Sequence, residues 1–257
     1  MATSIRKTSP APLTGSSYFD LSKEPLYILL FLLPLVAFYE VALAYSNSQI
    51  DGNNIQIKAH YHLVRFFEYF DLPATQGLGL GGIIIILILF IWHLTVANKW
   101  AINFKVLVFM TIESILLAFP LLVFGGFLGG LVATLENSSI ENLNLSERLA
   151  VSIGAGLYEE LVFRMIIIGF VHTVVCSILK QSNRAGLIIG VVFSSVLFAL
   201  YHDLPNAGSL SAISLFFFFT AGIYLGFLFI TRGFGIAAAT HAAYDVVATT
   251  ILASLAV

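Results

Sequence analysis

Seven long apolar runs make up most of this chain of 257 residues. A helix needs about 20 apolar residues to cross a bilayer. Hydrophobic residues account for 59% of the sequence and charged residues for only 10%, whereas a soluble domain carries about 25% charged residues. The pattern predicts an all-α, polytopic membrane helical bundle, with runs at residues 26–46, 77–97, 106–135, 149–179, 185–202, 209–231 and 234–254.

Two of the runs, 106–135 and 149–179, are longer than one crossing requires. Each predicts either a single tilted or kinked helix, with Pro120 as a candidate kink in the first, or two shorter helices. We therefore expect seven or eight transmembrane helices within one integral membrane domain at residues 26–257. The polar residues 1–25 predict an N-terminal tail.

The distribution of positive charge indicates how the bundle is oriented and what it binds. With seven spans and a cytoplasmic N-terminus, eight Lys and Arg residues lie in inner segments and three in outer ones, which favours a cytoplasmic tail. No basic run supports nucleic-acid binding, so the lipid bilayer is the expected surrounding partner. Cys176 is the only cysteine, which excludes a disulfide framework and a thiolate metal site.

Three charged side chains interrupt the apolar run at 149–179, in the sequence Glu159-Glu160-Leu-Val-Phe-Arg164. Each charge at the centre of a bilayer costs about 2.5–3.5 kcal/mol, and such residues usually face a protein interior or a watery cavity. Because residues four apart share a helix face, Glu160 and Arg164 are predicted to pair. Glu159 points elsewhere, which makes it the candidate general base or acid.

Two further polar clusters follow, Phe198-Ala-Leu-Tyr-His202 and His241-Ala-Ala-Tyr-Asp245. Imidazoles with a carboxylate can activate water, bind a metal or stabilise an oxyanion. A structural role is the alternative for each cluster, and His241 with Asp245 would then be a buried pair. On the boundaries above, the three clusters lie at different depths, so some helix ends must differ from the apolar runs. Further polar residues in or near the runs have no partner at helical spacing, namely Glu40, His93, Glu113 and His172.

The order EExxxR, FxxxH and HxxxD over residues 149–250 resembles the CAAX prenyl protease and bacteriocin-processing family of membrane proteins, also called CPBP or Abi. The resemblance implies an intramembrane endopeptidase on an all-helical bundle. It implies that Glu159 activates the attacking water with help from His202, and that His241 with residue 245 stabilises the oxyanion. Glu160 and Arg164 would support this site. The substrate would be a peptide or protein in or at the membrane.

The resemblance leaves the metal open, because both metal-dependent and metal-free mechanisms have been ascribed to this family. Glu159, His202 and His241 could form a three-ligand zinc site with an open water position. No HExxH or similar local ligand pair is present, which favours the metal-free mechanism and no cofactor. Asp245 stands where the family motif has Asn or Asp. An ionised Asp245 would repel an oxyanion, so it is expected either to be protonated or to orient His241.

The alternative is a non-proteolytic membrane protein. It would be an immunity or scaffolding member of the same family, or a small proton-coupled transporter, since intramembrane Glu, Arg and His also serve transport. No inverted repeat supports transport, because the polar clusters occur only in the second half of the chain.

Overall fold

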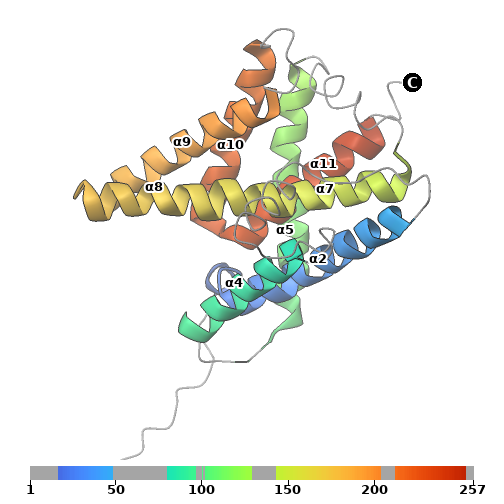
Figure 1. The fold of residues 1–257 in the computed structure, drawn as a ribbon, viewed down its shortest axis with the longest axis horizontal. Coiled ribbons are helices and arrows are strands. Elements are labelled where there is room, and N and C mark those ends of the chain that lie inside the picture. Colours follow the sequence, from blue (N-terminus) through green and yellow to red (C-terminus); the bar gives the residue numbers. More distant parts are fainter. Residues whose placement is uncertain are drawn as a thin grey trace, which may run out of the picture.

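A computed structural model describes residues 17–48, 80–96, 100, 102–128, 143–203 and 212–252. All regular structure in these residues is helical, which confirms the predicted all-α membrane bundle. The elements, shown in Figure 1, are α1 (Tyr18–Leu21), α2 (Pro25–Ser48), α4 (Leu80–Val96), α5 (Phe104–Phe127), α7 (Leu145–Glu160), η1 (Leu161–Ile168), α8 (Gly169–Thr173), η2 (Val174–Ile178), α9 (Asn183–Asp203), α10 (Ala212–Arg232), α11 (Phe234–Val246) and η3 (Val247–Leu252).

Each of the seven predicted apolar runs contains a helix. Among the described residues, five helices are long and apolar enough to cross a membrane, namely Pro25–Tyr45, Phe104–Phe127, Leu145–Ile178, Asn183–His202 and Ala212–Arg232. The run at 77–97 contains the shorter apolar helix α4, and the run at 234–254 contains α11 and η3. Most of the predicted polar tail, residues 1–16, lies outside the described residues, and α1 occupies part of the remainder.

The run at 149–179 forms one continuous helix from Leu145 to Ile178 rather than two. Asn144 caps its start, because its side chain accepts from the Glu147 amide while the Glu147 carboxylate accepts from the Asn144 amide. The helix ends before Lys180, which has a left-handed φ of 54°. The α5 helix likewise continues through Pro120 to Phe127, and residues 129–135 lie outside the described part.

A π-helical segment, η1, begins directly after Glu160 and lies inside this long helix. Wider π turns are rare and are often found at functional sites, because the extra residue per turn re-aims neighbouring side chains. The apolar periodicity does not predict this π-helical segment. The π-helical segment therefore indicates a functional site near Glu160.

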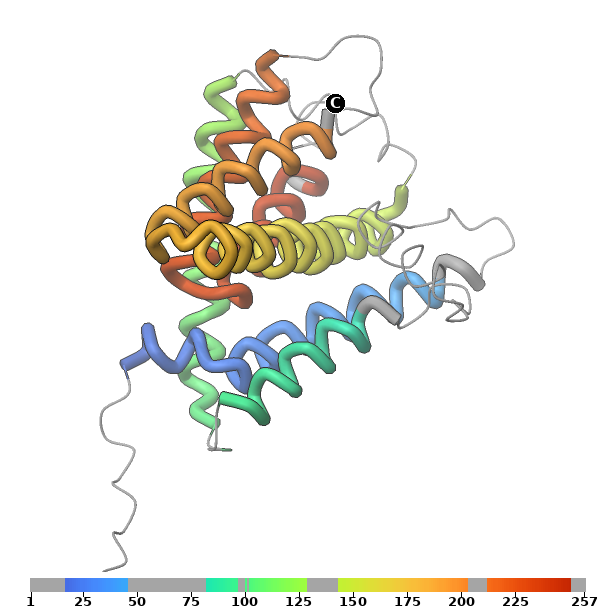
Figure 2. Tube along the Cα trace, turned by 60° about the vertical axis from the view of Figure 1, so that its left-hand side comes forward, coloured from blue at the N-terminus to red at the C-terminus, as the bar shows by residue number. Residues whose placement is uncertain are grey.

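The long helix lies across the middle of the molecule in Figure 1, with α11 packed against α7 and α9 packed against η1 and α8. On the other side, α2 packs against both α4 and α7, and α2 (blue) and α4 (green) run side by side in Figure 2. The α5 helix contacts α11 and crosses the direction of α7. This arrangement brings α7, α9 and α11, which carry the three polar clusters, to one place.

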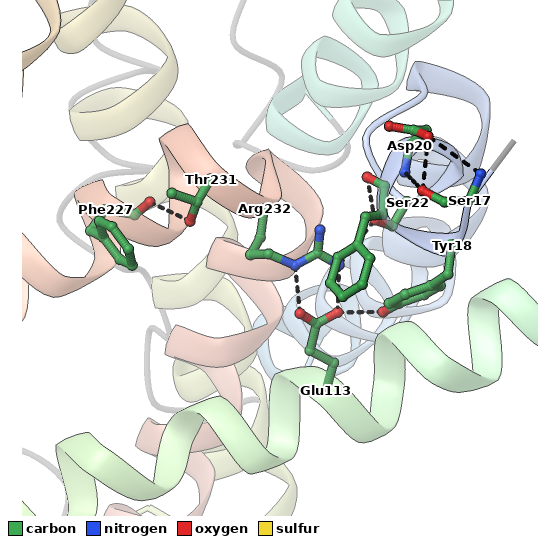
Figure 3. Close-up of polar contacts among 9 residues, drawn as sticks. Ser17, Tyr18, Asp20, Ser22, Glu113, Phe227, Thr231 and Arg232 are labelled. Atoms are coloured by element: carbon green, nitrogen blue, oxygen red, sulfur yellow. Dashed lines mark hydrogen bonds and ion pairs between the residues drawn. The ribbon is translucent and has the colours of Figure 1, made fainter.

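A polar cluster joins α1 to α5 and α10 (Figure 3). Arg232 binds both carboxylate oxygens of Glu113, with nitrogen–oxygen distances of 2.5 and 2.7 Å, and donates to the Ser22 hydroxyl at 3.2 Å. The Tyr18 hydroxyl also donates to Glu113, and burial raises the pKa of Tyr18, so the phenol keeps its proton at neutral pH. Glu113 therefore has a structural role here, with a partner from a distant helix.

Candidate active site

The three polar clusters meet in the described structure. Glu159 Oε2 lies 3.4 Å from His202 Nε2, and Glu160 Oε1 lies 3.0 Å from His241 Nδ1. The conflict in depth that the apolar runs implied is removed because α9 extends past His202 to Asp203 and packs across η1, while α11 packs against α7. All six predicted site residues thus belong to one connected cluster.

Glu160 and Arg164 form the predicted pair, with Glu160 Oε2 3.0 Å from Arg164 Nε. Both side chains are fully buried. Arg164 also donates to Ser194 Oγ at 3.3 Å, and its guanidinium lies over the Phe198 ring, 4.7 Å from the ring centroid. These contacts compensate the burial of a charge that would otherwise be very costly in an apolar core.

Glu159 has a different environment from its neighbour in sequence. Its side chain is buried, and among the described residues its Oε2 has no hydrogen bond of ordinary geometry. Its nearest basic group is His202 Nε2 at 3.4 Å. A buried carboxylate oxygen that lacks full hydrogen bonding is an acceptor for a water molecule or a substrate. Glu160 Oε2 also lacks a hydrogen bond of ordinary geometry, but Glu160 lies 3.0 Å from both Arg164 and His241, so Glu159 is the acid with fewer close partners.

Two contacts fix the ring of His202. Its Nδ1 lies 2.9 Å from the Phe198 carbonyl oxygen, which only accepts, so Nδ1 carries a proton. The ring stacks on Phe218 with centroids 4.2 Å apart. The other ring nitrogen, Nε2, is thereby aimed at Glu159, and a proton between these two atoms can reside on either.

His241 lies between two carboxylates. Its Nδ1 donates to Glu160, which Arg164 holds as an acceptor, and its Nε2 lies 3.4 Å from Asp245 Oδ2. His202, His241 and Asp245 also border a small cavity of about 10 Å³. A cavity of that size has room for about one water molecule. Glu159 does not line the cavity, but it contacts His202, which does.

The predicted zinc ligands do not form a metal-ligand set. Both ring nitrogens of His241 are directed at carboxylates of other residues, whereas His202, whose Nδ1 is bound to a backbone carbonyl, keeps Nε2 beside Glu159 in an orientation that is compatible with a ligand. In the part of the chain that the structure describes, no group of three His, Cys, Asp or Glu side chains is arranged to hold a metal ion. Glu159 and His202 remain adjacent, but a third ligand would require His241 to leave its present partners.

Two residues at the site were not expected from the sequence. Ser194 links α9 to the long helix, because its hydroxyl accepts from Arg164 at 3.3 Å and donates to the Phe163 carbonyl at 2.6 Å. Phe218 stacks on His202 but lies in a run of four phenylalanines, none of which is distinguished by its sequence context. Both roles depend on contacts between helices that sequence spacing does not reveal.

The remaining candidates lie elsewhere. Glu40 accepts from the Tyr158 hydroxyl at 2.7 Å and from the Gly82 amide at 2.9 Å, and so joins α2, α4 and α7. His172 contacts Asn183 at the far end of the long helix. His93 is buried with its ring edge-on to Trp100. None of the three belongs to the cluster around Glu159.

Gly156 allows α7 and α11 to approach closely enough for Glu160 to reach His241. A Cβ atom at this position would lie 2.6 Å from the Ala238 carbonyl oxygen and 2.6 Å from the Ala242 amide nitrogen. We expect Gly156→Ala to reduce the free energy of unfolding by about 1–3 kcal/mol, because backbone atoms cannot move aside as side chains do. Equilibrium unfolding in bicelles measures this.

Gly169→Ala in the same long helix is the matched control, since nothing lies within 4 Å of the added Cβ. It should be neutral or stabilising by about 0.5–1 kcal/mol, because alanine favours a helix over glycine. Equal effects at the two positions would show that the close approach at Gly156 is unimportant.

Residues 141–247 match the family model described as Rce1-like, type II CAAX prenyl endopeptidase. This segment includes all six site residues. Comparison with curated proteins and with solved structures gave no match. The ordered motifs, their convergence and the match over the whole site support the CAAX prenyl protease and bacteriocin-processing family of membrane proteins as the family that residues 141–247 of this chain resemble.

Proposed function

We propose that this protein is an intramembrane endopeptidase of the glutamate type. The observation that carries the proposal is the difference between two adjacent acids. Glu160 has close ion-pair contacts with both Arg164 and His241, at 3.0 Å each, whereas among the described residues the close ion-pair contact of Glu159 is with His202, at 3.4 Å. A buried carboxylate with spare acceptor capacity beside an imidazole suits general base catalysis.

In the proposed reaction, a water molecule lies beside Glu159 and His202 and contacts both. The water oxygen attacks the carbonyl carbon of the scissile peptide bond, and Glu159 takes the proton that the water loses. When the carbon–nitrogen bond breaks, the proton on Glu159 passes to the leaving amine. His202 assists this proton transfer through Nε2, because its Nδ1 is bound to the Phe198 carbonyl.

His241 is the proposed donor to the oxyanion that forms on the carbonyl oxygen. Glu160 fixes one edge of its ring through Nδ1, which leaves Nε2 on the side of Asp245 and the small cavity. Before the reaction, Asp245 thus orients the N–H group at Nε2 of His241. When the oxyanion forms, it accepts this hydrogen bond in place of Asp245. This assigns Asp245 an orienting role and requires no direct contact between two negative charges.

The proposed substrate class follows the description of the family, a peptide with a prenylated C-terminal CAAX sequence. The test is hydrolysis of a fluorogenic farnesylated CAAX peptide by purified protein in proteoliposomes. Release of the C-terminal fragment supports the proposal. If neither the farnesylated peptide nor the unmodified one is cleaved, and a proton gradient drives flux of a solute instead, the protein is a transporter and the proposal fails.

Activity should not depend on a bound metal. After dialysis against a strong chelator, we expect hydrolysis to continue at an unchanged rate, because the partners of His241 keep it from acting as a ligand. Elemental analysis of the same sample should find zinc well below one ion per chain. Loss of activity on chelation, with recovery on adding zinc, would instead support the three-ligand metal site.

A further inference from the structure

The last three residues of α7 each make a polar contact with a different helix. These contacts are Tyr158 with Glu40 of α2 at 2.7 Å, Glu159 with His202 of α9 at 3.4 Å, and Glu160 with His241 of α11 at 3.0 Å. Successive residues of a helix point about 100° apart, so the three side chains are spread around the axis of α7. The three contacts together therefore fix the rotation of this turn about its axis, and the first of them lies outside the proposed active site.

Glu40 is a carboxylate in the membrane-spanning helix Pro25–Tyr45, and the proposed mechanism does not use it. Such residues are costly in a bilayer and usually have a function. The oxygen that accepts from Tyr158 also accepts from the Gly82 amide at 2.9 Å. Gly82 is the third residue of α4, and the first amides of a helix have no acceptor within it and favour a negative charge. The start of α4 thus fixes Glu40 in the place where it meets Tyr158.

Tyr158 is closely packed against α2. Its side chain is fully buried, and its ring centroid lies 5.2 Å from that of Tyr39. The contact of α2 with α4 is equally close, because a Cβ atom at position 82 would lie 2.7 Å from Val36 Cγ1 and 2.8 Å from Glu40 Oε1. A buried hydroxyl that loses its acceptor is costly in an apolar core. The Tyr158 hydroxyl and Glu40 therefore restrain each other.

The backbone of this turn depends on such side-chain contacts. The π-helical segment η1 begins at Leu161, directly after Glu160. At the change from α to π geometry, the Leu161 amide is shared between the carbonyls of Leu157 and Tyr158. The regular hydrogen bonding of an α-helix is thus interrupted beside the two acids, and contacts with neighbouring helices determine where their side chains point.

We propose that Glu40 is a positioning residue for Glu159 and acts through the Tyr158 hydroxyl. By keeping Tyr158 against α2, Glu40 sets the rotation of the last turn of α7 at which Glu159 faces His202. Both α2 and α4 lie outside residues 141–247, the segment that matches the family model. The effect on catalytic rate rests on the proposed peptidase function, whereas the effect on the position of Glu159 does not.

The first test measures hydrolysis of the farnesylated CAAX peptide in proteoliposomes. Tyr158→Phe removes the hydroxyl and keeps the ring. We expect kcat to fall about 10- to 100-fold with KM unchanged, because misplacing a reacting group by about 1 Å can cost about 10²-fold. Glu40→Leu should cause the same loss, whereas Glu40→Gln should keep most of the activity because the amide oxygen can accept from Tyr158. Combining Tyr158→Phe with Glu40→Leu should cost no more than either change alone.

Tyr224→Phe is the matched control. The Tyr224 hydroxyl on α10 donates to the Leu117 carbonyl on α5 at 2.8 Å, so this variant also loses one hydrogen bond between helices. The two Tyr→Phe variants should lose similar stability in equilibrium unfolding, but Tyr224→Phe should keep the normal kcat. If Tyr158 served only the stability of the fold, kcat of the folded enzyme would be normal in both variants.

The second test does not depend on activity. Glu159 is 4% exposed and lies beside His202, so the hydrophobic reagent dicyclohexylcarbodiimide should modify its carboxyl group slowly. Peptide mass spectrometry should show modification of Glu159 several-fold faster in Tyr158→Phe and Glu40→Leu than in the unaltered protein, and Tyr224→Phe should match the unaltered protein. If the unaltered protein cleaves no peptide, the proposed peptidase function fails, and this measurement alone decides whether Glu40 positions Glu159.

Three results would overturn the proposal. The first is that Tyr158→Phe leaves the modification rate of Glu159 unchanged, or leaves kcat unchanged in a protein that cleaves the peptide. The second is that the losses from Tyr158→Phe and Glu40→Leu multiply in the double variant, which would show that the two residues act independently. The third is that Glu40→Gln loses as much activity as Glu40→Leu. If Glu40→Leu fails to fold, Tyr158→Phe and Glu40→Gln still decide.

Discussion

Glu159→Gln should abolish peptide hydrolysis while leaving the folded protein intact. Glutamine has the size and shape of glutamate but cannot take the proton of the attacking water. Loss of a general base lowers the rate by about 10²–10⁴-fold. The side chain is buried, and its close ion-pair contact among the described residues is with His202 at 3.4 Å, so removing its charge leaves the Glu160–Arg164 pair in place. Because the loss is in the chemical step, kcat should fall and KM should stay the same.

Glu147→Gln is the matched control, since it makes the same change in the same helix. Glu147 lies in the first turn of α7, where its side chain accepts from the Asn144 amide. Glutamine serves this capping role as well as glutamate. The control should keep full activity. Hydrolysis by Glu159→Gln at even a tenth of the normal rate would exclude Glu159 as the base, and Asp245, which borders the small cavity, would be the next candidate.

The site was predictable from the sequence where it depends on spacing within one helix. Glu160 and Arg164, and His241 and Asp245, are each four residues apart, and each pair is in contact. The contacts that create the site run between helices. Glu160 meets His241 across 81 residues, and no periodicity in the sequence encodes that approach.

The helices themselves followed from hydropathy, because every long apolar run contains one. The residues at which the helices end, and the way the helices cross, did not follow from hydropathy. Asn144 starts α7 before the apolar run begins, through a side-chain cap rather than through hydrophobicity. Gly156 sets the distance between α7 and α11, but the same residue type also occurs at Gly169, where an added Cβ would meet nothing within 4 Å. Only the packed neighbours distinguish the two glycines.

Arg164→Met should destabilise the protein more than any other single change in the site. Methionine fills similar space but leaves the carboxylate of Glu160 without its cation, in a position with no exposure to solvent. Removing one partner of a buried ion pair costs about 3–5 kcal/mol, because the remaining charge is buried and uncompensated. Ser194 also loses a donor. Equilibrium unfolding in bicelles should register the loss, and Arg184→Met, at an exposed arginine on α9, should not.

The double variant Glu160→Gln with Arg164→Met identifies the cause of the stability loss in Arg164→Met. If the cost arises from the stranded charge, neutralising Glu160 should restore most of the lost stability, and the double variant will be more stable than Arg164→Met alone. The amide oxygen of glutamine can still accept from His241 Nδ1, so the ring keeps its orientation. If the two changes are simply additive, the pair is not coupled, and Arg164 would then stabilise the fold through Ser194 and the Phe198 ring instead. In that case the contact at 3.0 Å would be incidental to stability, and the view that Glu160 is a braced support for His241 would have to be given up.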